Sequence, residues 1–181
     1  MVLRPLKPTL FRDGDLVIVT PDAAGAVVQV KTKLDGNAAW HKAAMDLARI
    51  SQRCREISKN DLWTGIFAYE GDLDQGQHIL DAVCKVHRQT GVAINRVACG
   101  RHLFMRFWPI GEYEPGDVAN DLQRAFWRTY RLRNLAPAYL VGNLIDSICD
   151  VERVETDYAF FAYREGKRGY RLDERRVEEC S

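Results

Sequence analysis

The stretch from residue 26 to residue 69 constrains the fold most, because it combines a strand, a long helix and a second strand. Residues 26–34 (AVVQVKTKL) are rich in β-branched side chains, and residues 62–69 (LWTGIFAY) form a similar apolar run. Between them, from residue 38 to about residue 58, apolar residues recur every three or four positions, which is typical of an amphipathic helix. This order predicts an α/β protein.

A short apolar run, Leu16–Val19, precedes the strand at 26–34. The segment between the two runs contains Pro21 and Gly25, which favour a turn. Two apolar strands joined by such a turn are expected to pair as a β-hairpin. A hairpin followed by alternating strands and helices predicts a mixed β-sheet flanked by helices.

The later elements follow from the same periodicities and from turn residues. A helix that begins at Asp72 or Asp74 is expected to end at Gly91, since glycine suits the left-handed cap position. The elements expected after it are strands at 94–99 and 103–108, a helix over 118–130, a helix over 138–148 with Pro137 in its first turn, and a strand at 158–163 that 169–172 would pair. The charged tail 173–181 is expected to be loose.

The composition agrees with one domain over residues 1–181, since 46% of the residues are hydrophobic and 28% are charged. A net charge of +1 argues against a general binder of polyanions, although a local basic cleft needs no overall excess of charge. No apolar run reaches the ~18 residues of a membrane span, and the N-terminus lacks the apolar stretch of a signal peptide. We therefore expect a cytoplasmic protein without membrane contact.

The five cysteines, at positions 54, 84, 99, 149 and 180, are widely spaced, and none forms a CxxC pair. We expect no zinc site and no disulfide framework, but reduced and mostly buried thiols. The four histidines likewise lack a metal-binding spacing such as HExxH, and no glycine-rich phosphate fingerprint follows a strand.

Three polar residues are the candidates for chemistry. Because side chains alternate along a strand, Gln29 and Lys31 point to one face and Val30 to the other. Asp15 lies where the preceding strand begins, and paired strands are about 4.8 Å apart. A carboxylate, an amide oxygen and an ammonium group are therefore expected to converge at one edge of the sheet. Such a group of side chains fits a metal ion and a phosphate.

These residues resemble a known family. The segment from Asp15 to Val19, with Gln29-Val30-Lys31 in the next strand, resembles the D…(E/Q)xK core of the PD-(D/E)xK nuclease superfamily. The glutamine variant is similar to Mrr-type restriction nucleases. The longer chain, including residues 131–139 (RLRNLAPAY), resembles an uncharacterised bacterial nuclease-like domain family. The motif covers residues 13–34, and the next helix and strand extend the match to about residue 70.

The resemblance implies a restriction-endonuclease-like core with its hairpin at 10–34 and an α+β extension at 112–172. It implies hydrolysis of phosphodiester bonds in DNA or RNA, assisted by Mg²⁺ or Mn²⁺, with a role in bacterial defence against phage. Asp15, the side-chain oxygen of Gln29 and the backbone carbonyl of Val30 would bind the metal. Lys31 would orient or deprotonate the attacking water and stabilise the developing charge. A neutral Gln29 would bind Mg²⁺ more weakly than a glutamate would.

One feature departs from the family. Many members carry an acidic residue on a helix before the first strand, but here only fourteen residues precede Asp15, and Pro5 and Pro8 disfavour a helix among them. Either that element is absent, or the chain is a fragment of a longer protein, or a second copy or a partner chain supplies the element. Asp13 is a candidate substitute for the missing acid.

Basic residues outside the motif are candidates for contact with nucleic acid, with solvated surface charge as the alternative. They are Lys33, Lys42 and Arg49, and further along Arg124, Arg128, Arg131 and Arg133, which interleave with Trp127 and Tyr130. The neutral Gln29 and the missing acid leave a second function open, a nuclease-like fold that binds nucleic acid or assembles with protein without catalysis. A third is protein–protein interaction through the aromatic residues of the C-terminal half, with a core role as the alternative.

Overall fold

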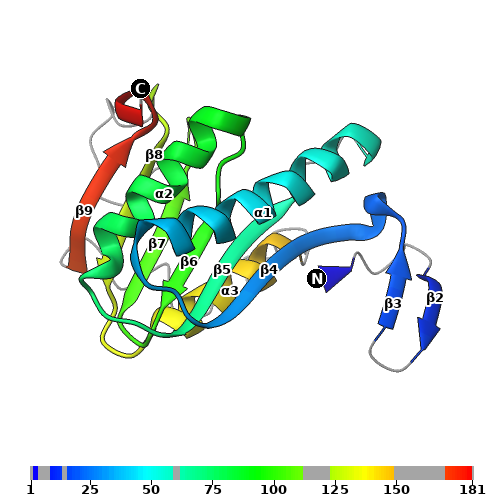
Figure 1. Ribbon diagram of the computed structural model, residues 1–181, viewed down its shortest axis with the longest axis horizontal. Helices are drawn as coiled ribbons and strands as arrows, with labels where there is room; N and C mark the ends of the chain where they lie inside the picture. Colours follow the sequence, from blue (N-terminus) through cyan, green and yellow to red (C-terminus); the bar gives the residue numbers. More distant parts are fainter. Residues whose placement is uncertain are drawn as a thin grey trace.

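The structure of the protein, a computed structural model, describes residues 2–3, 9–13, 16–58, 62–111, 123–148 and 170–180. Its centre is a seven-stranded mixed sheet with the strand order β1-β4-β5-β6-β7-β8-β9 (Figure 1). These strands are β1 (Val2–Leu3), β4 (Ala24–Lys33), β5 (Trp63–Glu70), β6 (Arg96–Cys99), β7 (Leu103–Trp108), β8 (Phe126–Arg131) and β9 (Arg171–Arg176). Strands β4, β5 and β6 are parallel, and the remaining neighbours in the sheet are antiparallel.

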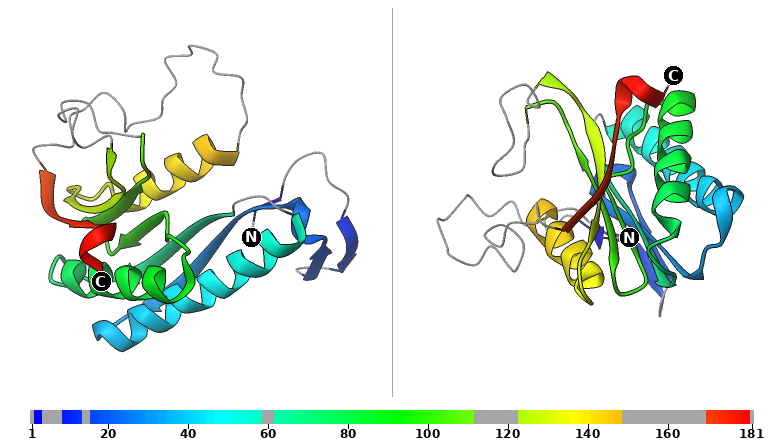
Figure 2. Two further views of the ribbon diagram at one scale, coloured as in Figure 1. Left: turned by 90° about the horizontal axis from the view of Figure 1, so that it is seen from above. Right: turned by 90° about the vertical axis from the view of Figure 1, so that its left-hand side faces the viewer.

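Helices cover both faces of the sheet. Helices α1 (Gly36–Ser58) and α2 (Gln75–Thr90) lie on one face, and α3 (Ala136–Ile148) lies on the other (Figure 2). The side chains of Trp40, Leu47 and Leu80 are buried between the sheet and the first two helices. A smaller core that includes Phe104 and Tyr139 lies beneath α3. The expected α/β fold, a mixed sheet flanked by helices, is therefore confirmed.

Local sequence explains the boundaries of α2. The residue before the helix is Asp74, and the helix ends at Gly91, which has the left-handed φ of 69° and donates its N–H to the carbonyl of His87. A glycine adopts this conformation without a steric penalty from a Cβ atom, so the expected cap is confirmed. No helix among the described residues combines the length and the apolar character that crossing a bilayer requires.

The expected pairing of the first hairpin is wrong. The strand β3 (Leu16–Val19) pairs with β2 (Thr9–Asp13) in a separate two-stranded sheet, whereas β4 pairs with β5 and β1. A short 3₁₀ helix, η1 (Pro21–Ala23), separates β3 from β4. The β2–β3 pair lies beyond the first residues of β4, so the interval 10–34 is not one hairpin (Figure 1).

Two predictions for the C-terminal half are also wrong. Residues 126–130, expected at the end of a helix over 118–130, belong to strand β8. Residues 171–176, most of which were expected in a loose tail, form the edge strand β9, which is followed by the 3₁₀ helix η4 (Val177–Cys180). The predicted strand at 158–163 lies outside the described residues.

The prediction of reduced thiols is wrong for one pair of cysteines. Cys84 on α2 and Cys180 in η4 are joined by a disulfide across 96 residues of sequence. Neither Cys54 nor Cys99 takes part in a disulfide. Since pairing partners so distant in sequence are brought together only by the fold, spacing alone gave no signal of this bond.

Candidate functional site

Strand β4 carries the motif, and its two faces are set by its packing. Val27 contacts the core beneath α1 and α2, and Val28 contacts the core beneath α3. Because side chains alternate, Gln29, Lys31 and Lys33 belong to the face that α1 and α2 cover. Val30 points to the opposite face, where 51% of it is exposed. The sequence therefore predicted correctly which motif residues share a face.

Gln29 has the least ordinary environment of these residues. It lies beside the fully buried Ile66 of β5 in the parallel ladder. The side-chain oxygen Oε1 of Gln29 is buried and accepts no hydrogen bond from the residues that the structure describes. A buried amide oxygen without a partner costs free energy, about 1–3 kcal/mol, and such atoms are rare in native proteins. A donor or a cation that reached this oxygen would remove that cost.

Lys31 and Lys33 differ although they share the face of Gln29. Lys31 is exposed beside Ala68 in the ladder. The ammonium group of Lys33 lies 2.8 Å from the carboxylate of Asp35. The hydrogen bond to Asp35 and the charge of that residue raise the pKa of Lys33. Lys33 is thus engaged in an ion pair, while Lys31 presents its charge to solvent.

The structure does not place Asp15 together with Gln29 and Lys31. Asp15 and its neighbour Gly14 lie outside the described residues. The strand that follows Asp15 pairs with β2, where Leu16 faces Asp13, and it makes no ladder with β4. These two strands therefore do not form the hairpin that was expected to bring Asp15 close to Gln29.

The basic residues of α1 do not extend the site. Trp40, Ala44 and Leu47 form the buried stripe of α1. With about 3.6 residues per turn, Lys42 and Arg49 lie on the opposite side of the helix, and both are exposed. The carboxylate of Asp46 is 3.8 Å from the guanidinium of Arg49. These two cations therefore face solvent away from β4.

The arginines of β8 do not form one basic surface either. In a strand, Arg128 and Arg131 point to opposite faces of the sheet. Arg128 is 2% exposed and forms an ion pair with Glu174 of β9. Arg96 and Arg106 lie in register with it on β6 and β7 and are also buried, and Arg96 donates to Asn143 of α3 at 2.8 Å. This row of arginines is part of the interior.

Four acidic residues that the sequence patterns do not mark as a site lie at one edge of the sheet. The parallel strands β4, β5 and β6 end at the same edge, where open α/β sheets commonly bind ligands. Asp35 follows β4, Glu70 ends β5, and Asp72 and Asp74 precede α2. Their positions directly after predicted strands were the available signal, but it requires knowing that these strands are parallel.

Cys99 lies close to these carboxylates at the end of β6. Its burial, and then the charges of Asp74, Asp72 and Asp35, raise the pKa of Cys99 from 9.0 to about 12. The thiolate is the reactive form of cysteine, so this thiol is inert at neutral pH. Above pH 9 the unfolded chain loses this proton while the folded chain keeps it. Stability is therefore lost progressively between pH 9 and the folded pKa of about 12.

We expect iodoacetamide at pH 8 to modify Cys99 about 1,000-fold more slowly in the folded protein than in urea, because three pKa units reduce the thiolate by that factor. Peptide mass spectrometry over time measures the rates. The partly exposed Cys54 serves as the internal comparison, since it is more accessible. Equal rates for Cys99 in the folded and unfolded protein would show that burial and the nearby carboxylates do not raise the pKa of this thiol.

The fold is that of an α/β protein. Its outer parallel strand, β4, carries Gln29 and Lys31 on one face. Within the described part of the chain, no group of three or more histidine, cysteine or acidic side chains is placed to hold a metal ion. Comparisons with protein-family models, curated proteins and solved structures found no match. The function therefore has to be argued from the residues of β4.

Proposed function

We propose that the protein is a metal-dependent nuclease that hydrolyses phosphodiester bonds of DNA or RNA, with bacterial defence against phage as its setting. One observation carries the proposal. The buried Oε1 of Gln29 has no hydrogen-bond partner in the described part of the chain, and Lys31 lies two residues later on the same face of β4. The similarity of this motif to the D…(E/Q)xK nucleases supports the same proposed activity.

The described residues fit a hard cation in two ways. The amide oxygen of Gln29 is a neutral oxygen ligand of the kind that Mg²⁺ and Mn²⁺ accept. Strand β1 pairs only with Ala24 and Ala26 of β4, so the later part of β4 has no ladder partner on its outer side among the described residues. Backbone carbonyls on that open edge, with that of Val30 as the candidate, would be further ligands. Asp15, which lies outside the described residues, is the proposed carboxylate ligand.

In this proposal the residues of the chain have separate tasks. When bound, Mg²⁺ supplies Lewis-acid stabilisation of the phosphoryl group. Gln29, on the face of β4 that α1 and α2 cover, would hold the cation through its buried side-chain oxygen. Lys31 places its exposed ammonium group beside the scissile phosphate and stabilises the charge that develops there. The ion pair of Lys33 with Asp35 would reduce the repulsion between that carboxylate and the phosphate.

We expect purified protein to cleave DNA or RNA only with Mg²⁺ or Mn²⁺ present. A Lys31→Ala variant is expected to lose about 100-fold or more of this activity, because removing one stabilising donor typically has that effect. Gel assays on single- and double-stranded substrates, with and without EDTA, measure the cleavage. Lys85→Ala is the matched control, since Lys85 is an exposed lysine on the outer side of α2.

The Lys85→Ala protein should retain full activity and Lys31→Ala should keep the wild-type melting temperature. Metal-dependent cleavage that survives Lys31→Ala undiminished would assign the activity to another site or to a contaminant. The absence of cleavage by wild-type protein on every substrate would reject the nuclease.

A second candidate is a nuclease-like fold that binds nucleic acid or assembles with protein without catalysis. The pairing of β3 with β2 favours it, because the strand after Asp15 does not lie beside β4. Under this alternative, binding to nucleic acid weakens as salt concentration rises, and no cleavage accompanies it.

A further inference from the structure

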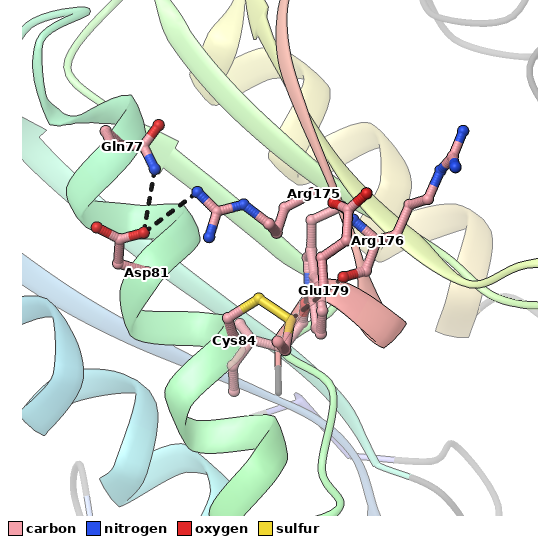
Figure 3. The surroundings of a disulfide bond; sticks show 9 residues. Gln77, Asp81, Cys84, Arg175, Arg176 and Glu179 are labelled. Atoms are coloured by element: carbon pink, nitrogen blue, oxygen red, sulfur yellow. Dashed lines mark hydrogen bonds and ion pairs between the residues drawn. A yellow bond between two sulfur atoms is a disulfide. The ribbon is translucent and has the colours of Figure 1, made fainter.

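The disulfide between Cys84 and Cys180 fastens the C-terminal end of the described chain to the body of the fold (Figure 3). Cys84 lies on α2, whose side chains contribute to the main core, and Cys180 is in η4, directly after the edge strand β9. The two Cα atoms are 5.2 Å apart, and both cysteines are buried. The bond therefore joins α2 to the 3₁₀ helix that follows the edge strand.

The other attachments of β9 are non-covalent and mostly near the surface. None of its six side chains is fully buried. Arg175 forms an ion pair with Asp81 of α2 at 3.4 Å, and both side chains are partly exposed (Figure 3). Glu174 pairs with Arg128, and Val177 is a partly buried contact with the core. The partly exposed Arg175–Asp81 pair contributes little free energy, so the pair with the buried Arg128 and the backbone ladder to β8 are the main non-covalent attachments of β9. An edge strand with few buried side chains is among the parts of a fold that open most easily.

We propose that Cys84–Cys180 is a reducible latch, so that its reduction releases β9 and η4 from the sheet and from α2. Release would leave β8, whose outer side β9 covers, as the new edge strand. Unpaired backbone N–H and C=O groups on such an edge are open to pairing with another strand. The thiol–disulfide balance around the protein would then determine whether β9 or β8 is the edge strand on that side of the sheet.

The chemistry requires a dithiol reductant. One thiolate of the reductant attacks a sulfur of the Cys84–Cys180 bond, which forms a mixed disulfide and frees the other cysteine as a thiolate. The second thiol of the reductant then resolves the mixed disulfide. In total two electrons and two protons pass to the cysteines, giving two thiols, and the reductant becomes a disulfide. The inert, buried Cys99 does not compete in this exchange.

The test is amide hydrogen exchange of the full chain before and after treatment with dithiothreitol. Mass spectrometry of a non-reduced digest should first show the Cys84 and Cys180 peptides linked. After reduction, the amides of residues 171–176 and those of β8 that face β9 are expected to exchange about tenfold faster or more, while those of α1 stay unchanged. Cys180→Ser should exchange like reduced wild type in either condition.

Cys54→Ser is the matched control, because it removes a cysteine outside the disulfide and should respond to reduction as wild type does. If Cys180→Ser fails to fold, reduced and alkylated wild-type protein takes its place. Absence of the linked peptides would overturn the proposal. So would unchanged exchange of β9 after complete reduction, since the strand would then be held without the bond.

Discussion

Replacing Gly100 by alanine is expected to lower the free energy of unfolding by about 3 kcal/mol or more, through backbone strain and a steric overlap. Gly100 follows β6, has a φ of +58° and donates its N–H to the carbonyl of Ala68 at 2.9 Å. A Cβ atom at this position would overlap the backbone carbonyl oxygen of Gly71. Backbone cannot rotate out of the way as a flexible side chain can.

Gly71 lies against the end of β6. Its own φ is +151°, and a Cβ atom on it would overlap the sulfur of Cys99, so the loops after β5 and β6 are in close contact. Gly100→Ala must therefore move the loops after β5 and β6 apart. Urea denaturation, followed by circular dichroism, measures the loss of stability.

Gly91→Ala is the matched control for this prediction. Gly91 also has a left-handed φ, +69°, but no atom of the described residues lies within 4 Å of a Cβ atom built there. Its substitution carries only the conformational cost, about 1–2 kcal/mol. If the two variants lost the same stability, the close approach of Gly100 to Gly71 would not be a feature of the protein.

Replacing Gln29 by leucine is expected to change activity and stability in opposite directions. Leucine has a similar volume and removes the buried oxygen that lacks a partner, so we expect the metal-free protein to be about 1 kcal/mol more stable. The same change removes a proposed metal ligand, so cleavage should fall about 100-fold or more. A gain of stability with a loss of activity is typical of residues kept for function.

Denaturation in EDTA and metal-dependent cleavage are the two measurements. Gln123→Leu makes the same chemical change at an exposed position and should alter neither quantity. Gln29→Glu should retain cleavage and bind Mn²⁺ more tightly, because a carboxylate adds charge to the ligand set. Loss of stability in Gln29→Leu would show that the amide has a structural partner, and the metal-ligand role would then fail.

The sequence predicted the elements whose signals are local. The apolar runs of β4 and β5, the long stripe of α1 and the cap Gly91 each lie within one short segment, so their patterns survive without knowledge of the fold. The alternation along β4 also placed Gln29 and Lys31 on one face. Residues 126–130 were misassigned because aromatic residues four apart, Phe126 and Tyr130, fit a helix as well as a six-residue strand.

The tertiary structure alone decided the features that depend on contacts between distant segments. Strand pairing is non-local, so the turn at Pro21 did not show that β3 joins β2 and that β4 lies beside β5. An edge strand needs no apolar face, so the charged β9 resembled a tail. Whether Oε1 of Gln29 has a partner is set by what packs over it. A sequence specifies each residue's chemistry, but burial and proximity arise only when the whole chain has folded.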